Sequence, residues 1–286
     1  MYRSVSFGAV NVNPGAGLEA AVKMAKKYDF KGIEASPHQI LEYGVEQAIN
    51  LLSESGMVIS GFGLPVHPIL GSEQDQKTGI EQMPAQAKIM SEVGVERCCI
   101  WLLNSNDNFD YEQNFKFHVE RLSPFAKILK DNGIRLGLEF IGTESLRRKG
   151  KYPFIHTAKE MLELAGACGE NCGLLLDAWH WHMSGGGRDL FSVIGDQKYI
   201  VNVHVNDAPE GDRNEMPDSP RAMPGETGII DIEFFMDGLA KIGYDGPVVT
   251  EPFSPVLAAM GDNDEKMALV KKSLDKIRPA NHTTDF

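Results

Sequence analysis

Cysteine is scarce in this sequence. The four residues present, Cys98, Cys99, Cys168 and Cys172, are too few in 286 residues for a disulfide framework. Long apolar runs are also missing, because none reaches the roughly 18–20 residues that a membrane helix needs. The first residues, MYRSVSFGAV, lack the basic and apolar regions of a signal peptide. We therefore expect a cytoplasmic protein with no membrane partner.

Positive charge is in short supply as well. The chain has 28 basic and 40 acidic side chains, which give a formal net charge of −12. Binding to a nucleic-acid backbone needs a basic surface that displaces counterions, so this balance argues against a nucleic-acid partner. Hydrophobic residues make up 42% and charged residues 24%, an ordinary balance for a folded protein that excludes a disordered chain.

Short apolar segments alternate with amphipathic segments along the whole chain. We predict strands at Ser4–Val10, Gly32–Ala35, Val58–Leu64, Arg97–Leu103, Arg135–Ile141, Gly173–Asp177, Tyr199–Asn206 and Pro247–Glu251. We predict helices at Leu18–Tyr28, Gly44–Ser55, Gly79–Val93, Tyr111–Asp131, Phe154–Cys168, Asp189–Ile194, Asp231–Ile242 and Asp262–Ile277. Several of the strands are continuous apolar runs, which is typical of a parallel sheet buried on both faces. Eight strand–helix units of about 36 residues each fit a closed (β/α)8 TIM barrel.

The alternative fold is an open doubly wound sheet, which usually carries a G-x-G-x-x-G turn after its first strand. The turn at Gly8–Gly15 has no such pattern. No change of composition divides the chain, so we predict one domain over residues 1–286, with a tail at about 278–286 that is frayed or contacts a partner. The longest irregular stretch, Asp207–Thr227, has a length typical of functional lids or disordered loops.

Four polar residues stand at the carboxyl ends of successive predicted strands: Glu139, Asp177, His204 and Glu251. The active site of a TIM barrel is built at this end of the strands. Three buried carboxylates repel one another, and a divalent cation removes that repulsion. Carboxylates with one imidazole suit Mn²⁺, Mg²⁺, Co²⁺ or Zn²⁺. A single strand-end acid is often only a helix cap, but four in register predict a metal site.

The strings LGLEF, LLLDAWH, VHVNDA, PGETGIID and VVTEPF resemble the xylose-isomerase-like barrel superfamily, in its sugar isomerase and epimerase branch. This branch includes D-tagatose 3-epimerase-like and inosose isomerase-like enzymes. The resemblance implies the same four metal ligands, with Mn²⁺ as the first choice, and makes Glu139 and Glu251 the proton-transfer pair. It also implies that His180 contacts the substrate and that Arg221 matches a substrate-binding arginine. Arg213 is a competing match, because this loop is longer than in the compact epimerases.

The implied chemistry is removal of a proton next to a carbonyl that a divalent cation polarises, which gives an enediolate. Returning the proton to the opposite face gives an epimer, and returning it to the neighbouring carbon gives an aldose–ketose isomer. Expulsion of a β-substituent gives elimination instead. The same Glu139 and Glu251 core serves all three outcomes, so we predict a sugar isomerase or epimerase acting on a ketose or keto-sugar.

Other residues are weaker candidates for the same site. His67 follows the third strand and is predicted to contact the substrate, or else is merely solvated. Glu34 is a candidate substrate-binding or outer-sphere carboxylate. Trp101 is predicted to shield the site from water, or to fill the barrel mouth as core. Asp207 either orients the ring of His204 or caps its own loop. The run Arg147–Lys149 is a weak candidate for binding a substrate phosphate.

Three other functions stay open at this point. One is a lyase for 3-keto-glycosides, including C-glycoside cleavage, which works with a small companion subunit. Another is an endonuclease for abasic DNA, which uses three zinc ions and a basic surface that this acidic chain lacks. The third is a sugar-binding protein without catalysis, which has no need of two opposed carboxylates. By analogy with such barrels we also expect a homo-oligomer.

Overall fold

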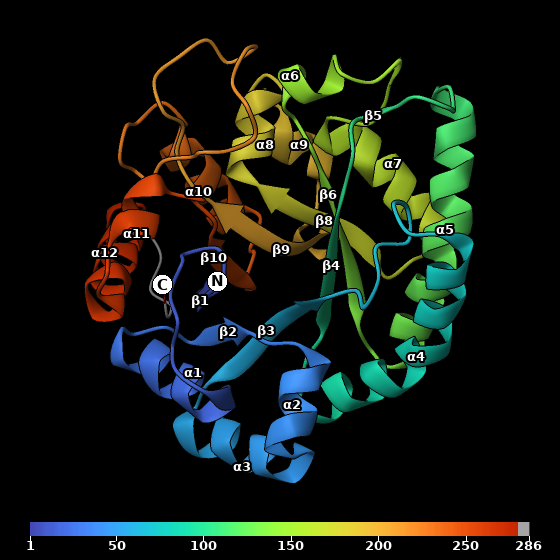
Figure 1. Cartoon of the computed structure of the whole chain (residues 1–286). Helices are drawn as coiled ribbons and strands as arrows, with labels where there is room; N and C mark the ends of the chain where they lie inside the picture. The colour runs from blue at the N-terminus through green and yellow to red at the C-terminus, as the bar shows by residue number, and fades with distance from the viewer. Residues whose placement is uncertain (280–285) are drawn as a thin grey trace.

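Eight parallel strands close into a barrel with helices around it (Figure 1). The computed structural model describes residues 1–279 and 286. The barrel strands are β1 (Tyr2–Val5), β2 (Gly32–Glu34), β3 (Val58–Gly63), β4 (Arg97–Leu102), β6 (Arg135–Phe140), β8 (Cys172–Asp177), β9 (Ile200–Val205) and β10 (Pro247–Thr250). They neighbour one another in chain order, and β1 closes the ring by pairing with β10. The predicted single-domain TIM barrel is confirmed.

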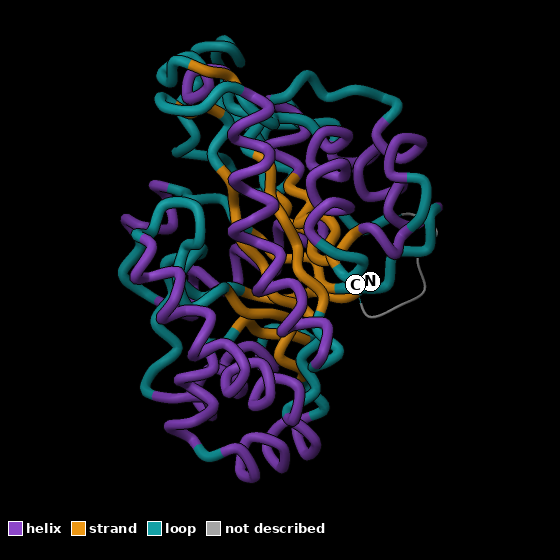
Figure 2. Tube along the Cα trace, turned by 90° about the vertical axis from the view of Figure 1, so that its right-hand side faces the viewer, coloured by secondary structure: helices purple, strands orange, loops and turns teal. Residues whose placement is uncertain are grey.

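A helix follows each barrel strand and covers the outside of the sheet, as the side view in Figure 2 shows. These helices are α1 (Gly17–Lys27), α3 (Val45–Ser55), α4 (Glu73–Glu92), α5 (Tyr111–Asp131), α7 (Ala158–Cys168), α9 (Leu190–Ile194), α10 (Ile232–Lys241) and α12 (Asn263–Lys276). Their buried residues recur at helical spacing, as with Leu18, Ala21, Val22 and Ala25 in α1. The helices therefore form because one face of each packs against the barrel.

Several short elements were not predicted. They are the helices α2 (Pro37–Tyr43), α6 (Glu144–Arg147), α8 (Ala178–Met183) and α11 (Pro255–Ala259), the 3₁₀ turn η1 (Gln197–Tyr199), and the antiparallel pair β5 (Ser105–Asn106) and β7 (Tyr152–Pro153). Gly44, whose φ is 95°, separates α2 from α3 where one helix was expected. Such short elements carry too few residues to show a period of their own.

Two predicted boundaries are wrong by five residues or more. The first strand ends at Val5 rather than Val10, because the chain turns back on itself and the amide of Val10 donates to the carbonyl of Ser6 at 3.3 Å. The fourth helix begins at Glu73 rather than Gly79. Ser72 caps this helix by accepting a hydrogen bond from the amide of Asp75, and the side chain of Asp75 accepts one from the amide of Ser72.

Strand order and register decide which side chains meet at the carboxyl end of the barrel. Strands β6, β8, β9 and β10 are consecutive neighbours. Asp177 at the end of β8 pairs with His204 in β9, and His204 pairs with Val249 in β10. Every residue of β8 and β9 is buried, as expected for strands covered on both faces. The sheet thus brings the ends of these four strands to one place.

The predicted irregular stretch Asp207–Thr227 contains no helix or strand, and one isolated bridge joins Asp207 to Ala222. Of the predicted tail, residues 280–285 lie outside the described residues. Phe286 is not frayed: it is buried, and the guanidinium of Arg3 lies 5.4 Å from its ring, so the two chain ends lie together (Figures 1 and 2). No helix within residues 1–279 is long and apolar enough to cross a membrane.

Candidate functional site

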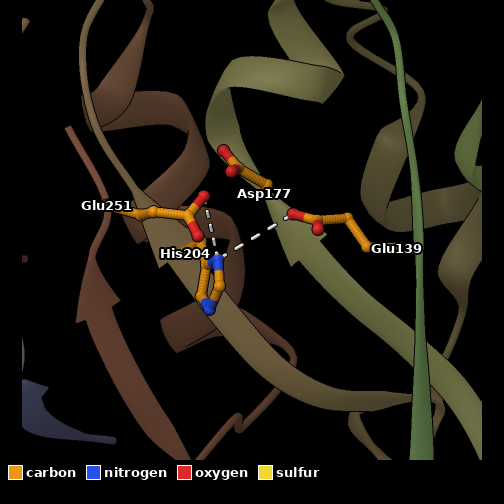
Figure 3. Close-up of side chains that lie close together, drawn as sticks. All are labelled: Glu139, Asp177, His204 and Glu251. Atoms are coloured by element: carbon orange, nitrogen blue, oxygen red, sulfur yellow. Dashed lines mark ion pairs between the residues drawn. The ribbon is translucent and has the colours of Figure 1, made fainter. Parts of the chain in front are cut away.

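The four predicted ligand residues converge at the carboxyl end of the barrel (Figure 3). Glu139 comes from β6, Asp177 ends β8, His204 comes from β9, and Glu251 directly follows β10. Each offers one nitrogen or oxygen atom, and these four atoms all lie within 4.8 Å of one another. Two ligand atoms on one ion with bonds of about 2.0–2.2 Å lie no more than about 4.4 Å apart. The cluster is therefore close to the size of a metal site.

Hydrogen bonding inside the cluster is incomplete. Oε1 of Glu139 and both ring nitrogens of His204 are buried and have no hydrogen-bond partner among the described residues. His204 Nδ1 lies 3.3 Å from Oε2 of Glu251 and 3.8 Å from Oε1 of Glu139. Buried polar atoms without partners are rare in native proteins. Three carboxylates and an imidazole with unused lone pairs form a donor set that fits a divalent cation.

The two glutamates differ in acidity because their surroundings differ. Burial, followed by the charge of Glu251, raises the pKa of Glu139 well above its usual value. Burial opposes ionisation of Glu251 too, but His204 and Arg221 outweigh it and lower the pKa of Glu251 to about 2. Burial would lower the pKa of His204, but the surrounding carboxylates, Glu251 first, raise it to about 10. Two carboxyl groups with separated pKa values are what paired acid–base chemistry needs.

Arg221, rather than Arg213, reaches the cluster. Its buried guanidinium donates through Nη1 to Oδ2 of Asp177 at 2.8 Å and to Oε2 of Glu251 at 2.9 Å. It also lies 5.0 Å from the ring of Phe253, a cation–π contact. Arg213 instead donates to the backbone carbonyl of His182 at 3.4 Å. Of the two arginines, Arg221 is thus the one that contacts the four-residue cluster.

His180 has only one ring nitrogen free to face the cluster. The amide of Gly142 donates to its Nδ1 at 3.2 Å, so Nε2 is the nitrogen that faces the cluster. This Nε2 lies 3.4 Å from Nη2 of Arg221 and 3.9 Å from Oε1 of Glu139. The approach requires glycine at 142, because a Cβ there would stand 2.1 Å from the carbonyl oxygen of His180. The ring of His180 is thereby held with Nε2 toward the cluster.

A cavity of about 340 Å³ opens beside the cluster. Its polar lining consists of Glu139, His180, Asp218, Arg221 and Glu251. Its apolar lining consists of Trp101, Leu103, Ile141, Leu146 and Phe253. Trp101 is 43% exposed and Phe253 40% exposed, so Trp101 is not core and aromatic rings stand at the cavity mouth. A larger cavity of about 640 Å³ lies near the amino ends of the strands, away from the four-residue cluster.

Two predicted substrate contacts do not line this cavity. Both ring nitrogens of His67 face backbone groups: Nδ1 accepts from the amide of Leu70, and Nε2 lies 3.1 Å from the carbonyl oxygen of Trp101 in β4. This corrects the expected substrate contact, because His67 packs against Trp101 and is not among the residues that line the cavity. Glu34 is half-buried, with Oε1 3.5 Å from the amide nitrogen of Asn202. Burial raises the pKa of Glu34, and the charge of His204 opposes this rise.

Asp207 does not orient the ring of His204, which corrects a second expectation. Its carboxylate accepts hydrogen bonds from four backbone amides of its own loop, those of Ala208, Thr227, Gly228 and Ile230. The neighbouring Asn206 contacts the cluster instead, because its side-chain amide donates to Oδ1 of Asp177 at 2.9 Å. Neither this contact of Asn206 nor the position of Asp218 was predicted from the sequence. Adjacency to His204 was a signal for Asn206, whereas Asp218 lies in a stretch without any periodic pattern.

Comparison with known proteins agrees with this geometry. A sequence profile described as xylose isomerase-like TIM barrel matches residues 22–280. An inosose isomerase from Bacillus velezensis is 22% identical over 255 residues, 87% of this chain and 88% of that protein. A ketose 3-epimerase from Arthrobacter globiformis is 24% identical over 254 residues, 85% and 80% of the two chains. The solved IolI protein with a bound zinc atom matches with a TM-score of 0.79 at 19% identity, covering 97% of this chain and 98% of that one. The chain belongs to the xylose isomerase-like TIM barrel family.

Proposed function

We propose that this protein is a divalent-metal-dependent isomerase or epimerase of keto-sugars. The single observation that carries the proposal is the buried cluster of Glu139, Asp177, His204 and Glu251 beside a cavity. Relatives that span most of this chain are an inosose isomerase and a ketose 3-epimerase, which supports the same class of substrate. We propose Mn²⁺ as the ion, with Mg²⁺, Co²⁺ and Zn²⁺ as alternatives for the same ligands. The zinc atom bound to the IolI protein supports a divalent ion in this fold.

The two glutamates carry the proton transfers in this proposal. An ion held by the cluster supplies the Lewis acidity that polarises a carbonyl group. Glu251, whose pKa is held at about 2, is ionised at neutral pH and accepts the proton from the carbon next to the carbonyl. Glu139 is the second group of the pair and returns a proton to that carbon. Return to the opposite face of that carbon gives an epimer.

The other residues of the cavity bind and orient the sugar. His180 donates its Nε2–H to a substrate oxygen, since Gly142 occupies Nδ1. Arg221 holds Asp177 and Glu251 in position through Nη1 and leaves the rest of its guanidinium near the cavity. The exposed face of Trp101 covers the C–H face of the sugar and excludes water from the reacting carbon.

One observation weighs against the abasic-site endonuclease. Over residues 1–279 and 286, a single group of His, Cys, Asp and Glu side chains has the spacing of a metal site. A three-zinc centre needs several such groups side by side. The companion subunit of a lyase, a homo-oligomer and the cytoplasmic location stay predictions.

The test is exchange of a substrate C–H with solvent deuterium, followed by proton NMR with D-fructose, D-psicose, D-tagatose and an inosose. Dialysis against a chelator should stop the exchange, and added Mn²⁺ or Co²⁺ should restore it. Glu139→Gln and Glu251→Gln should each lower the exchange rate by about 100-fold or more, because general acid–base groups contribute about 10²–10⁴-fold. Glu42→Gln, an exposed acid on α2, is the matched control and should exchange at the wild-type rate. Full exchange by either cluster variant, with normal circular dichroism, would refute its role.

A further inference from the structure

The carboxylate of Asp218 is built into the cavity wall and fixed there. Its Oδ1 accepts hydrogen bonds from Nε1 of Trp179 at 3.1 Å and from the hydroxyl of Thr143 at 2.9 Å. The two donors come from different parts of the barrel, since Trp179 lies in α8 and Thr143 follows β6. The side chain is 32% exposed and lines the cavity beside His180 and Arg221. Asp218 is thus held rigidly and still accessible to a ligand.

The second oxygen of Asp218 retains acceptor capacity. Its contact with Nη2 of Arg221 is 3.5 Å long, at the limit of a hydrogen bond. Arg221 is already engaged at 2.8 Å and 2.9 Å by Asp177 and Glu251, so it does not saturate Asp218. A carboxylate oxygen accepts two hydrogen bonds. A hydroxyl group in the cavity would therefore find a strong acceptor in Oδ2.

The charge around the cavity is unfavourable to an anionic ligand. Arg221 is the one arginine or lysine among the described residues that line the cavity, and three carboxylates share it. The arginines that follow β6 are also engaged, Arg147 by Glu144 and Arg148 by Glu144 and Glu215. Glu139, Asp218 and Glu251 line the cavity against this single guanidinium, so Asp218 adds negative charge to a wall in which carboxylates already outnumber basic side chains.

The geometry points to Asp218 as a specificity-determining residue that accepts a hydrogen bond from a sugar hydroxyl and rejects phosphorylated sugars. The inference rests on the proposed function and narrows its substrate to a neutral, unphosphorylated keto-sugar. The carboxylate performs both tasks, because a hydroxyl donates to its oxygen and a phosphate is repelled by its charge. A residue that merely anchored the loop would affect both kinds of ligand in the same direction.

The experiment is titration calorimetry of the Mn²⁺-loaded protein with D-fructose, D-psicose and D-tagatose, and with the 6-phosphates of the same sugars. Wild-type protein should bind the free sugars at least about 10-fold more tightly than the phosphates. Asp218→Asn keeps an oxygen that can accept from Trp179 and Thr143 but removes the charge. Its Kd for a free sugar should rise about 10- to 100-fold, as for the loss of a hydrogen bond to a charged group. Its Kd for the phosphate should stay equal or fall.

Asp212→Asn, the same change at an exposed position of the same loop, is the control and should leave all Kd values unchanged. Equal weakening of both ligand types by Asp218→Asn would overturn the proposal, as would phosphates that bind the wild type as tightly as free sugars. Failure to bind any of these sugars would overturn it too. Deuterium exchange is read separately. If Asp218→Asn shifts the Kd values of free sugar and sugar phosphate as expected but no deuterium exchange occurs, only the proposed reaction is refuted. If exchange occurs but Asp218→Asn leaves the ratio of these two Kd values unchanged, only the role of Asp218 is refuted.

Discussion

His204 sits between two carboxylates, and this decides its protonation. Its Nδ1 is 3.3 Å from Glu251 and 3.8 Å from Glu139, and both acids favour the charged imidazolium. Burial acts in the opposite direction, but the acids prevail and the pKa of His204 rises to about 10. A metal ion binds only the neutral imidazole. Metal binding below pH 10 therefore has to displace the proton that His204 carries.

We predict that Mn²⁺ binding at pH 8 releases about one proton more from the wild-type protein than from His204→Gln. The proton count follows from calorimetry in buffers of different ionisation enthalpy. The wild-type affinity should increase about 10-fold per pH unit for each proton released, up to the pKa of about 10. His180→Gln, which alters a neighbouring histidine outside the ligand set, should leave the count unchanged. If the wild type and His204→Gln release equal numbers of protons on Mn²⁺ binding, His204 is not a ligand of the ion.

The positions of the cluster residues were predictable wherever a strand fixed them. The side chain at the carboxyl end of a barrel strand has little choice of direction, so Glu139, Asp177 and His204 followed from strand position. The residues after a strand are not fixed in this way. Asn206 and Asp207 are adjacent, but only the structure shows that Asn206 holds Asp177 while Asp207 turns into its own loop. Asp218 lies farther along the same loop, where nothing in the sequence indicates its position.

The long loop Asp207–Thr227 is a structured element although it contains no helix or strand. Asp207 is fully buried, and its two carboxylate oxygens accept hydrogen bonds of 2.8–2.9 Å from four backbone amides. The amide of Arg221 donates to the carbonyl of Pro252 at 3.1 Å, and the hydroxyl of Ser145 donates to the carbonyl of Met216 at 2.6 Å. These bonds hold the segment that carries Asp218 and Arg221 over the barrel mouth.

We expect Asp207→Ala to lower the free energy of unfolding by about 2–4 kcal/mol, because it leaves several buried amides without an acceptor. Urea unfolding measures this loss. Limited proteolysis should show new cleavage within residues 208–226, and sugar binding should fall as Arg221 and Asp218 lose their positions. Asp212→Ala removes an exposed turn contact in the same loop and serves as the control. Resistance of the Asp207 variant to both treatments would contradict the anchoring role.

At the level of elements, long segments were predictable and short ones were not. The helix Tyr111–Asp131 matches its prediction residue for residue, since Asp110 and Gln113 form a capping box and apolar residues recur over five turns. The four-residue α6 and six-residue α8 exist because the barrel rim holds them. Trp179 in α8 is fully buried, and its Nε1 reaches Asp218. Contacts of this kind come from distant parts of the chain and leave no local pattern.

At the scale of the whole molecule, the barrel concentrates acids that oppose its own folding. Closure of the ring places β6, β8, β9 and β10 side by side, which brings three carboxylates within reach of one ion. Burial and Glu251 raise the pKa of Glu139 above its unfolded value of about 4.5. For an acid with a raised pKa, the folded state loses stability as the pH rises above the unfolded pKa. Without metal, Glu139 therefore destabilises the protein at neutral and alkaline pH.

Because the buried charge of Glu139 destabilises only the metal-free protein, we predict opposite effects of Glu139→Gln on the metal-free and the Mn²⁺-loaded protein. Glu139→Gln should raise the free energy of unfolding of the chelator-treated protein by about 1–2 kcal/mol at pH 8, because it removes a buried acid that lacks a partner. Mn²⁺ at 100 times the Kd of the wild type should stabilise the wild type by about 2.7 kcal/mol. The same Mn²⁺ concentration should stabilise the variant by less than half of that amount. The same change should have no stabilising effect near pH 4, where Glu139 is protonated in both states. Urea unfolding with and without Mn²⁺ gives all these values.

Glu163→Gln, which changes a glutamate on the outer helix α7, controls for the loss of one negative charge. A Glu139→Gln protein that is destabilised without metal would mean that this carboxylate supports the barrel itself rather than a bound ion.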